Sequence, residues 1–172
     1  MRIYSGQVRL ISRDVIDDLK SNGQIEIDDT YYDEAIADIE AILREYIRTD
    51  REIHEEAREQ ARARGGGSQM VHRIKRKLAK RRRFSYGEEA QEWIVEQMIE
   101  ILLYSDHVEE VYADDRQLRR AINKVLKRYL ETDDELEKEA RSKLKNLEEG
   151  SAAWDIEYEK LMGNLKKQKG LL

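Results

Sequence analysis

Apolar residues recur at intervals of three and four along most of the chain, which is the spacing of one face of an α-helix. The first pattern, in residues 6–20, has the apolar positions Val8, Ile11, Val15, Ile16 and Leu19. A longer pattern runs through residues 39–57, and a narrow third one consists of Val71, Ile74 and Leu78. Three similar patterns follow in the second half, at residues 86–104, at residues 122–140 and at Trp154, Tyr158, Leu161 and Leu165. The chain is therefore predicted to be all-α, with about six helices that each turn one face inward.

The second set of patterns aligns with the first after a shift of 83 residues. Residues 11–58 align with residues 94–141 without a gap, and 13 of these 48 pairs are identical. The clearest match is between LREYIRTDREIHEEAR at residues 43–58 and LKRYLETDDELEKEAR at residues 126–141. Charged helices share Glu, Lys and Leu by composition alone, but these identities include tyrosine and a Thr-Asp pair. We expect one domain over residues 1–172, made of two three-helix repeats at 1–84 and 85–172 that pack about a pseudo-two-fold axis.

Glycine-rich and capping segments indicate where the helices begin and end. The two long helices are expected to end at RGGGSQ, residues 64–69, and at EEGSAA, residues 148–153, because glycine readily adopts the left-handed conformation at helix C-termini. Residues 85–88, Ser-Tyr-Gly-Glu, have the form of a capping box and predict a helix start. Thr49 and Thr132 lie in similar motifs, where the long helices either continue or restart. The unbroken apolar spacing around Thr49 favours continuity.

One segment of each half, between its first two helices, resembles a β-strand. SNGQIEIDD at residues 21–29 alternates at Ile25 and Ile27, and HVEEVY at residues 107–112 occupies the equivalent place. The two segments form either ordered loops or a short two-stranded ribbon, and the loops are the favoured prediction.

Composition narrows the class of protein. The chain has 172 residues, of which 40% are charged, and it contains no proline and no cysteine. This charge content predicts long, thin helices with a large surface, and proline would have interrupted helix interiors. Without cysteine, disulfides, thiolate metal sites and cysteine nucleophiles are excluded. The longest apolar run, ILLY at residues 101–104, is too short to span a membrane, and we expect a cytoplasmic protein.

No motif in the sequence predicts catalysis. His54, His72 and His107 are scattered, and pairs of carboxylates one helical turn apart, such as Glu52 and Glu56, are typical of a solvated helix face. The segment GGGSQ at residues 65–69 lacks the Gly-Lys-Ser/Thr of a phosphate-binding loop. We therefore expect a protein that is not an enzyme, with no metal, no cofactor and no small-molecule substrate.

Positive charge is concentrated in HRIKRKLAKRRRF, residues 72–84. This segment carries +8, whereas the rest of the chain carries −13. On a helix that packs through Ile74 and Leu78, an opposite arc of about 120° contains Arg73, Arg76, Lys77, Lys80 and Arg83. The equivalent residues of the second half, Ile156, Glu159, Lys160, Gly163 and Lys166, carry only +1 against +5, so folding does not require the basic face. The predicted polyanion-binding residues are Arg73, Arg76, Lys77, Lys80, Arg81, Arg82 and Arg83.

The basic segment has three alternative interpretations. Its side chains neutralise the acidic helices of their own chain, bind nucleic acid, or bind an acidic protein or a membrane surface. Phe84, Tyr86 and Trp93 are nearby candidates for stacking on bases, although the helical spacing of Trp93 is typical of a core residue. The leading hypothesis is a binding module for RNA or another nucleic-acid polyanion. The alternative is a structural or adaptor protein whose long helices bind a protein partner or a second copy of the chain.

Five segments carry a resemblance to a known family. They are MRIYSGQV at 1–8, ILREYIRTDREI at 42–53, GEEAQEWIVEQM at 87–98, HVEEVYADDRQLRR at 107–120 and LKNLEEGSAAWDIEYEKLM at 144–162. Through them, nearly the whole chain resembles the bacterial family known as domain of unknown function 507. The resemblance implies a small bacterial protein without an assigned activity, so it supplies no catalytic or ligand-binding residues. The sequence departs from the family pattern at RIKRKLAKRRRF, residues 73–84, which lacks the acidic residues found there in the family.

Overall fold

The fold is described from a computed structural model that covers residues 3–147 and 152–170. The side chains of Glu88, residues 131–134, Ala152, Asp155 and Glu159 lie outside the description. The helices of the described chain are α1 (Val8–Ser21), α2 (Tyr32–Ala63), α3 (Ser68–Arg81), α4 (Ala90–Tyr104), α5 (Asp115–Lys143) and α6 (Ala152–Gln168). Single turns of 3-10 helix at Ser5–Gln7, Asp29–Tyr31 and Gly87–Glu89 precede α1, α2 and α4. The prediction of an all-α fold with about six helices is confirmed.

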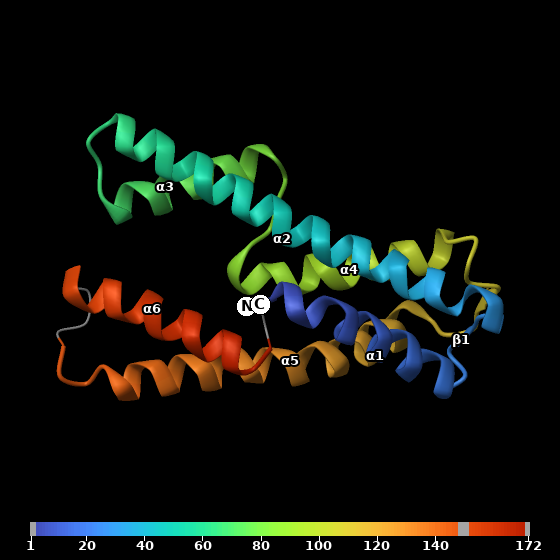
Figure 1. Cartoon of the computed structure of the whole chain (residues 1–172). Helices are drawn as coiled ribbons and strands as arrows, with labels where there is room; N and C mark the ends of the chain where they lie inside the picture. Colours follow the sequence, from blue (N-terminus) through green and yellow to red (C-terminus); the bar gives the residue numbers. More distant parts are fainter. Residues whose placement is uncertain (1–2, 148–151, 171–172) are drawn as a thin grey trace.

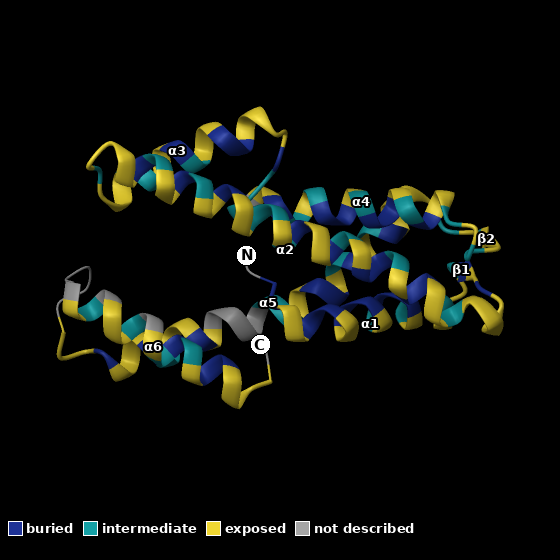
Figure 2. Ribbon diagram, turned by 45° about the horizontal axis from the view of Figure 1, so that its top comes forward, coloured by how far each residue is buried: buried dark blue, intermediate teal, exposed yellow. Residues whose placement is uncertain are grey.

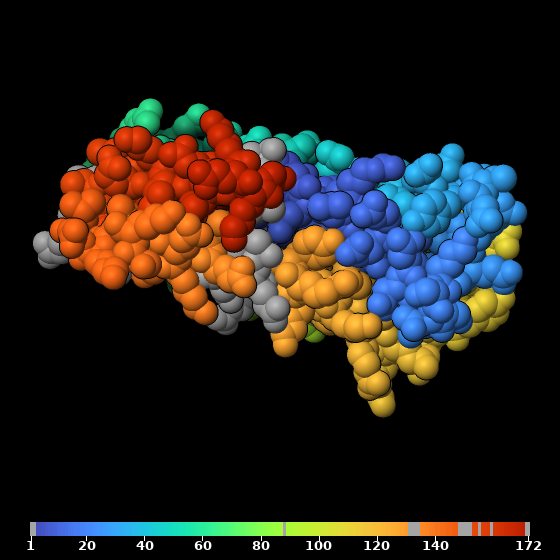
Figure 3. All heavy atoms as spheres, turned by 60° about the horizontal axis from the view of Figure 1, so that its bottom comes forward, coloured from blue at the N-terminus to red at the C-terminus, as the bar shows by residue number. Residues whose placement is uncertain are grey.

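The helices form a body with two arms (Figure 1). In the body, α1 and α4 pack with the N-terminal halves of α2 and α5. The first arm is the C-terminal half of α2 with α3 packed back along it, and the second arm is the C-terminal half of α5 with α6 packed along it. In the space-filling view, the second arm occupies one end of the molecule, and α1 with the start of α2 extends toward the other end (Figure 3). The two arms therefore project from the same end of the body.

One hydrophobic core runs through the body and into the first arm. All five apolar positions expected on the first helix are buried in α1, where Ile11, Ile16 and Leu19 are completely inaccessible. Their neighbours in the core include Ile39 and Leu43 of α2, and Figure 2 shows the buried positions on the facing sides of these helices. Burial of one such side chain contributes about 1.5–3 kcal/mol relative to its exposure to water. The prediction from the helical spacing that these positions face the core is therefore confirmed for α1.

Two tyrosines attach α1 to the long helices at the edge of this core. The Tyr32 hydroxyl donates a hydrogen bond to Asp17 Oδ1 at 2.5 Å, and this bond together with partial burial raises the pKa of Tyr32 to about 12. The Tyr129 hydroxyl donates to Asp14 Oδ2 at 2.7 Å, and burial together with this bond raises the pKa of Tyr129 to about 12. α1 is therefore hydrogen-bonded to α2 on one side and to α5 on the other.

A two-stranded antiparallel ribbon closes the end of the body opposite the arms. Its strands are β1 (Ile25–Glu26) and β2 (Glu110–Val111), with Ile25 opposite Val111 and Glu26 opposite Glu110. The favoured prediction of ordered loops is wrong here, and the ribbon alternative is confirmed. Two residues per strand are too few for the local spacing to distinguish a strand from a loop. The pairing also depends on a partner strand from the other half of the chain. Ile25 of the ribbon and Ile27, just after β1, are both buried.

The two long helices end differently. α2 ends at Ala63, and the predicted stop at RGGGSQ is confirmed by Gly65, which has a φ of +66°, and by the Gly66 N–H, which donates to the Ala61 carbonyl at 2.9 Å. α5 ends at Lys143, before EEGSAA, of which residues 148–151 lie outside the described chain. Leu144 is the C-cap residue of that helix, its backbone N–H donates to the Ala140 and Arg141 carbonyls, and its side chain is buried. Both helices are continuous through Thr49 and Thr132, so the favoured prediction of continuity is confirmed.

The capping box expected at residues 85–88 is not where the helical turn begins. Tyr86 occupies the N-cap position of the turn at Gly87–Glu89, and its side chain makes no capping hydrogen bond. Gly87 has a φ of +71° and turns the chain at this point, which separates Ser85 from the helix. A capping box does begin α5, where Asp114 Oδ1 accepts from the Gln117 N–H and Gln117 Oε1 accepts from the Asp114 N–H.

The second arm has a small hydrophobic cluster that is separate from the main core. Its buried members are Tyr4, Leu136, Ala140, Met162 and Leu165, with Tyr158 and Leu161 partly buried against them. The expected placement of Trp154 in the core is wrong, because Trp154 is only partly buried and its ring stacks on Tyr158 with the centroids 4.6 Å apart. In the described part of this arm α6 packs on α5, and two helices offer less surface for burying the first turn of α6 than the several helices of the body do.

The order of elements is the same in both halves, with a short helix, a strand, a long helix and a last helix in each. The ribbon pairs the corresponding strands of the two halves. Duplication about a pseudo-two-fold axis stays a prediction.

Candidate polyanion-binding surface

α3 is attached to α2 by a narrow apolar face, as its spacing predicts. Ile74 and Leu78 are buried, with 5% and 3% of their surfaces exposed, and Val71 is partly buried beside them. The opposite face carries Arg73, Arg76, Lys77 and Lys80, all of which are exposed. The predicted basic helix therefore exists and presents its charge to solvent.

Two basic residues of the segment pair with carboxylates of α2. Lys75 Nζ lies 2.7 Å from Asp50 Oδ1. Arg82 contacts Glu56 at 2.6 Å and Glu52 at 3.6 Å. Lys75 and Arg82 therefore follow the first interpretation, in which basic residues neutralise the acidic helices of their own chain. Of the two, only Arg82 belongs to the predicted polyanion-binding residues.

The other predicted binding residues are directed to solvent. These six residues, called the basic surface below, are Arg73, Arg76, Lys77, Lys80, Arg81 and Arg83. No carboxylate that the structure describes lies within 4 Å of their charged groups. The surface thus carries six positive charges that the described part of the fold does not neutralise.

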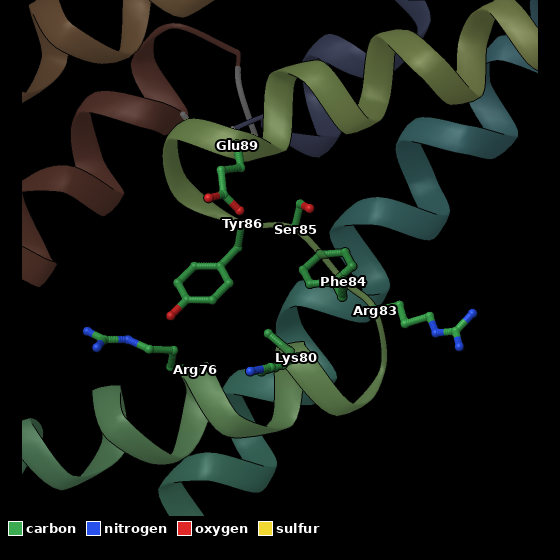
Figure 4. Close-up of a pocket in the computed structure, with 8 residues that line it drawn as sticks. Arg76, Lys80, Arg83, Phe84, Ser85, Tyr86 and Glu89 are labelled. Atoms are coloured by element: carbon green, nitrogen blue, oxygen red, sulfur yellow. The ribbon is translucent and has the colours of Figure 1, made fainter.

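Arg83 lies beyond the helix, which corrects the predicted five-residue arc. α3 ends at Arg81, and Arg83 has a φ of +53°, in the left-handed region where other residues than glycine are uncommon. The Phe84 N–H closes the turn by donating to the Ala79 carbonyl at 2.9 Å. This turn directs the Arg83 side chain away from Arg76 and Lys80 (Figure 4). The helix face itself therefore holds four of the five residues expected there.

A glycine occupies the equivalent position after two other helices. Gly23 after α1 and Gly65 after α2 have φ values of +64° and +66°, and each is followed by the same type of backbone hydrogen bond. A side chain in this conformation costs about 1–2 kcal/mol. The turn after α3 therefore has an arginine at the position where the turns after α1 and α2 have a glycine.

An open pocket of about 650 Å³ lies where α3 turns toward α4. Its lining residues are Arg76, Ala79, Lys80, Arg83, Phe84, Ser85, Tyr86 and Glu89. Figure 4 shows Arg76 and Lys80 on the α3 side, with Tyr86 across from them and Glu89 above Tyr86, farther from α3. The pocket thus combines cationic groups of the basic surface with an aromatic ring.

The three candidate aromatic residues have different surroundings. Phe84 is buried and stacks on Tyr46, with the centroids 5.1 Å apart, and both rings contact Trp93 at 5.9 Å. Phe84 and Trp93 therefore join the third helix to the main core. Tyr86 lines the pocket, and Lys75 Nζ lies 5.0 Å from the centre of its ring. Tyr86 is the candidate left for stacking on a ligand.

The second arm has no matching surface among its described residues. Ile156 is 67% exposed where the first arm has Arg73, and Lys160 lies 3.7 Å from Glu157. Lys166 is buried to 8% exposure, with Nζ 4.8 Å from the centre of the Tyr4 ring. Lys166, which aligns with Arg83, therefore packs against another side chain of the chain and does not present its charge to solvent.

A polar cluster outside this surface was not found by sequence reasoning. Asp38 Oδ2 accepts a hydrogen bond from Ser105 Oγ at 2.5 Å and lies 2.9 Å from His107 Nδ1. The hydrogen bond with Asp38 raises the pKa of His107. The Ser105 hydroxyl and the His107 imidazole both contact the carboxylate, and Ser105 Oγ also accepts a hydrogen bond from the His107 backbone N–H at 3.1 Å. An activated nucleophile would instead have its hydroxyl hydrogen-bonded to the imidazole. No local motif marks this cluster, because Asp38 is 67 residues from Ser105.

The described residues contain neither a candidate metal-ligand cluster nor a candidate membrane-spanning helix. No group of three or more His, Asp or Glu side chains is placed to hold a metal ion. No helix there combines the length and the apolar character that crossing a membrane requires.

Comparison with known proteins assigns the chain to a family. The model of the family described as "Protein of unknown function (DUF507)" matches residues 1–171. A comparison with curated proteins gives no match. Since the family match covers the sequence from its first residue to its penultimate one, the chain belongs to the DUF507 family.

Proposed function

We propose that the protein is a non-catalytic binding module that holds RNA or another nucleic-acid polyanion on the basic surface. The observation that carries this proposal is the presence of six exposed cationic residues with no described carboxylate in ion-pair range. Phosphate groups are the natural partners of such a surface, because each contact releases a counterion condensed on the nucleic acid.

The fold itself has no need of these charges. α3 docks through Ile74 and Leu78, and its contacts to α2 carboxylates come from Lys75 and Arg82. Six like charges on one short segment repel each other, so their removal is expected to leave stability unchanged or to raise it slightly. A surface that the fold does not require is best explained by a partner.

Fluorescence anisotropy with a labelled single-stranded oligoribonucleotide tests the proposal. About five phosphate contacts give a slope of about −3.5 in a plot of log affinity against log salt concentration. Unrelated sequences are expected to respond to salt similarly, since phosphate contacts carry no sequence information. Failure of the wild-type protein to bind at low salt contradicts the proposal.

Charge reversal locates the binding surface. The combined substitutions Arg76→Glu, Lys80→Glu and Arg83→Glu are expected to abolish binding and to leave the protein folded. The matched control, Lys138→Glu, Lys145→Glu and Lys167→Glu, makes the same change in net charge at exposed positions of the second arm and the turn within it. Equal loss of binding in both variants refutes a localised surface. Unfolding of the first variant shows instead that the basic residues are internal partners of the acidic helices.

A structural or adaptor role is the second candidate function. The observation in its favour is a set of exposed apolar side chains just before α2, at the end of α4 and just after β2: Tyr31, Leu103, Tyr104 and Tyr112. These parts of the elements lie at the end of the body opposite the arms (Figure 1). Tyr104 is 79% exposed and Leu103 is 56% exposed. Light scattering over a range of protein concentrations tests self-association, which Leu103→Ser with Tyr104→Ser is expected to abolish.

A further inference from the structure

We infer that the pocket at the turn from α3 to α4 receives one unpaired nucleotide, with its base against the Tyr86 ring and its phosphates beside Arg76 and Lys80. This inference rests on the proposed function and deepens it, because it makes single-stranded RNA the preferred ligand over duplex RNA. It arises from the juxtaposition of cations from α3 with an aromatic ring that lies across an open pocket.

The pocket has the dimensions and the access that such a ligand requires. Its volume of about 650 Å³ lies within the range of about 300–1,000 Å³ found for sites that bind small organic molecules. A base inside an A-form duplex is stacked between its neighbours and paired, so it does not enter a side pocket. An unpaired base is free to leave the strand and stack on an aromatic side chain.

Tyr86 is held in place before any ligand binds. Lys75 Nζ lies 5.0 Å from the centre of the Tyr86 ring, and the same amino group lies 2.7 Å from Asp50 Oδ1 of α2. Only 15% of the Lys75 side chain is exposed. A fixed ring loses little conformational entropy on binding, which makes stacking more favourable.

The charges around the pocket orient the nucleotide. Arg76 and Lys80 lie on the α3 side, whereas Glu89 lies on the same side as Tyr86 (Figure 4). The Glu89 carboxylate repels phosphate and the two cations attract it. The backbone of the strand is therefore expected along α3, with the base turned toward Tyr86.

The test compares single-stranded and duplex oligoribonucleotides of equal length by fluorescence anisotropy at one salt concentration. Wild-type protein is expected to bind the single strand about tenfold more tightly, the order of magnitude by which stacking of one base changes affinity. Tyr86→Leu is expected to remove this preference, while Tyr86→Phe keeps it. Neither variant is expected to change duplex affinity or the salt slope, because phosphate contacts are unaltered.

Tyr104→Leu provides a matched control, since Tyr104 is an exposed tyrosine at the other end of α4. It is expected to bind both ligands as the wild type does. Equal wild-type affinity for single strand and duplex overturns the pocket inference but leaves the proposed function standing. Absence of binding to both ligands at low salt overturns both. If Tyr86→Leu lowers the melting temperature enough to unfold the protein, the wild-type comparison of the two ligands decides.

Discussion

Arg83 is the residue whose backbone conformation is hardest to explain by folding alone. Replacement by glycine relieves a cost of about 1–2 kcal/mol for the left-handed conformation but adds about 0.5–1 kcal/mol of chain entropy to the unfolded state. Arg83→Gly is therefore expected to raise the free energy of unfolding by about 0.5–1 kcal/mol, measured by urea denaturation. Gly65→Ala provides the converse control and is expected to lower it. A loss of stability in Arg83→Gly indicates that the arginine side chain supports the fold.

His107 gives the stability of the body a dependence on pH. Its hydrogen bond with Asp38 is the largest cause and raises its pKa above the ordinary 6.5. Desolvation lowers the pKa, whereas the charges of Asp38, Glu34 and Asp106 add smaller contributions that raise it. A histidine with a raised pKa stabilises the fold fully below its unfolded pKa, and this contribution is lost as pH rises through the folded pKa. His107→Asn is therefore expected to lower the melting temperature more at pH 5.5 than at pH 8.5.

The double variant His107→Asn with Asp38→Asn serves as the control for this prediction. Without the Asp38 carboxylate, His107 has no partner that favours its charged form. The difference in melting temperature between the double variant and Asp38→Asn alone is therefore expected to be nearly independent of pH over the same range. An equal effect of His107→Asn at both pH values contradicts the assignment of the charge to this pair.

At the scale of elements, α6 contains both a buried leucine, Leu165, and a partly buried, stacked tryptophan, Trp154, and the two are expected to contribute differently to stability. Leu165 is 4% exposed in the cluster of the second arm, and Leu165→Ala is expected to lower the free energy of unfolding by about 3 kcal/mol. Trp154 is only partly buried and stacks on Tyr158, so Trp154→Ala is expected to cost only about 1 kcal/mol. Chemical denaturation of both variants measures the difference. The reverse order of the two effects contradicts the described packing of α6.

The elements that could be predicted from the sequence are those whose signal is local. The spacing of Ile11, Ile16 and Leu19 is enough to predict α1, because a helix buries one face whatever its neighbour is. The local spacing around Ile25 does not decide between a loop and a ribbon, because the partner residue Val111 comes from the other half of the chain. The predicted start of the α4 region differs from the structure for another reason: Gly87, inside the capping motif, has a positive φ and turns the backbone between Ser85 and the helix.

The same distinction applies to the candidate surface. The exposed face of α3 follows from its helical period, and the structure places Arg76 and Lys80 as expected. The ion pairs of Arg82 depend on the position of α2, and the direction of Arg83 depends on a backbone conformation that is unusual for arginine. The pocket with Tyr86 forms only when α3 and the start of α4 come together, and no sequence spacing contains that information.

At the scale of the molecule, charge is distributed unevenly. The chain has a net charge of −5, although residues 72–84 alone carry +8. A polyanion is therefore repelled by the chain as a whole and attracted by the first arm. This distribution favours one binding orientation, and it makes association sensitive to ionic strength.

The separate hydrophobic cluster of the second arm has a consequence for local opening. Detachment of α6 exposes the few side chains around Leu165, whereas opening of α1 exposes the main core. Because the free energy of a local opening rises with the apolar surface that it exposes, amide protons of α6 are expected to exchange with solvent faster than those of α1. The second arm can therefore fluctuate while α3 stays docked, and the basic surface keeps its shape throughout such fluctuations.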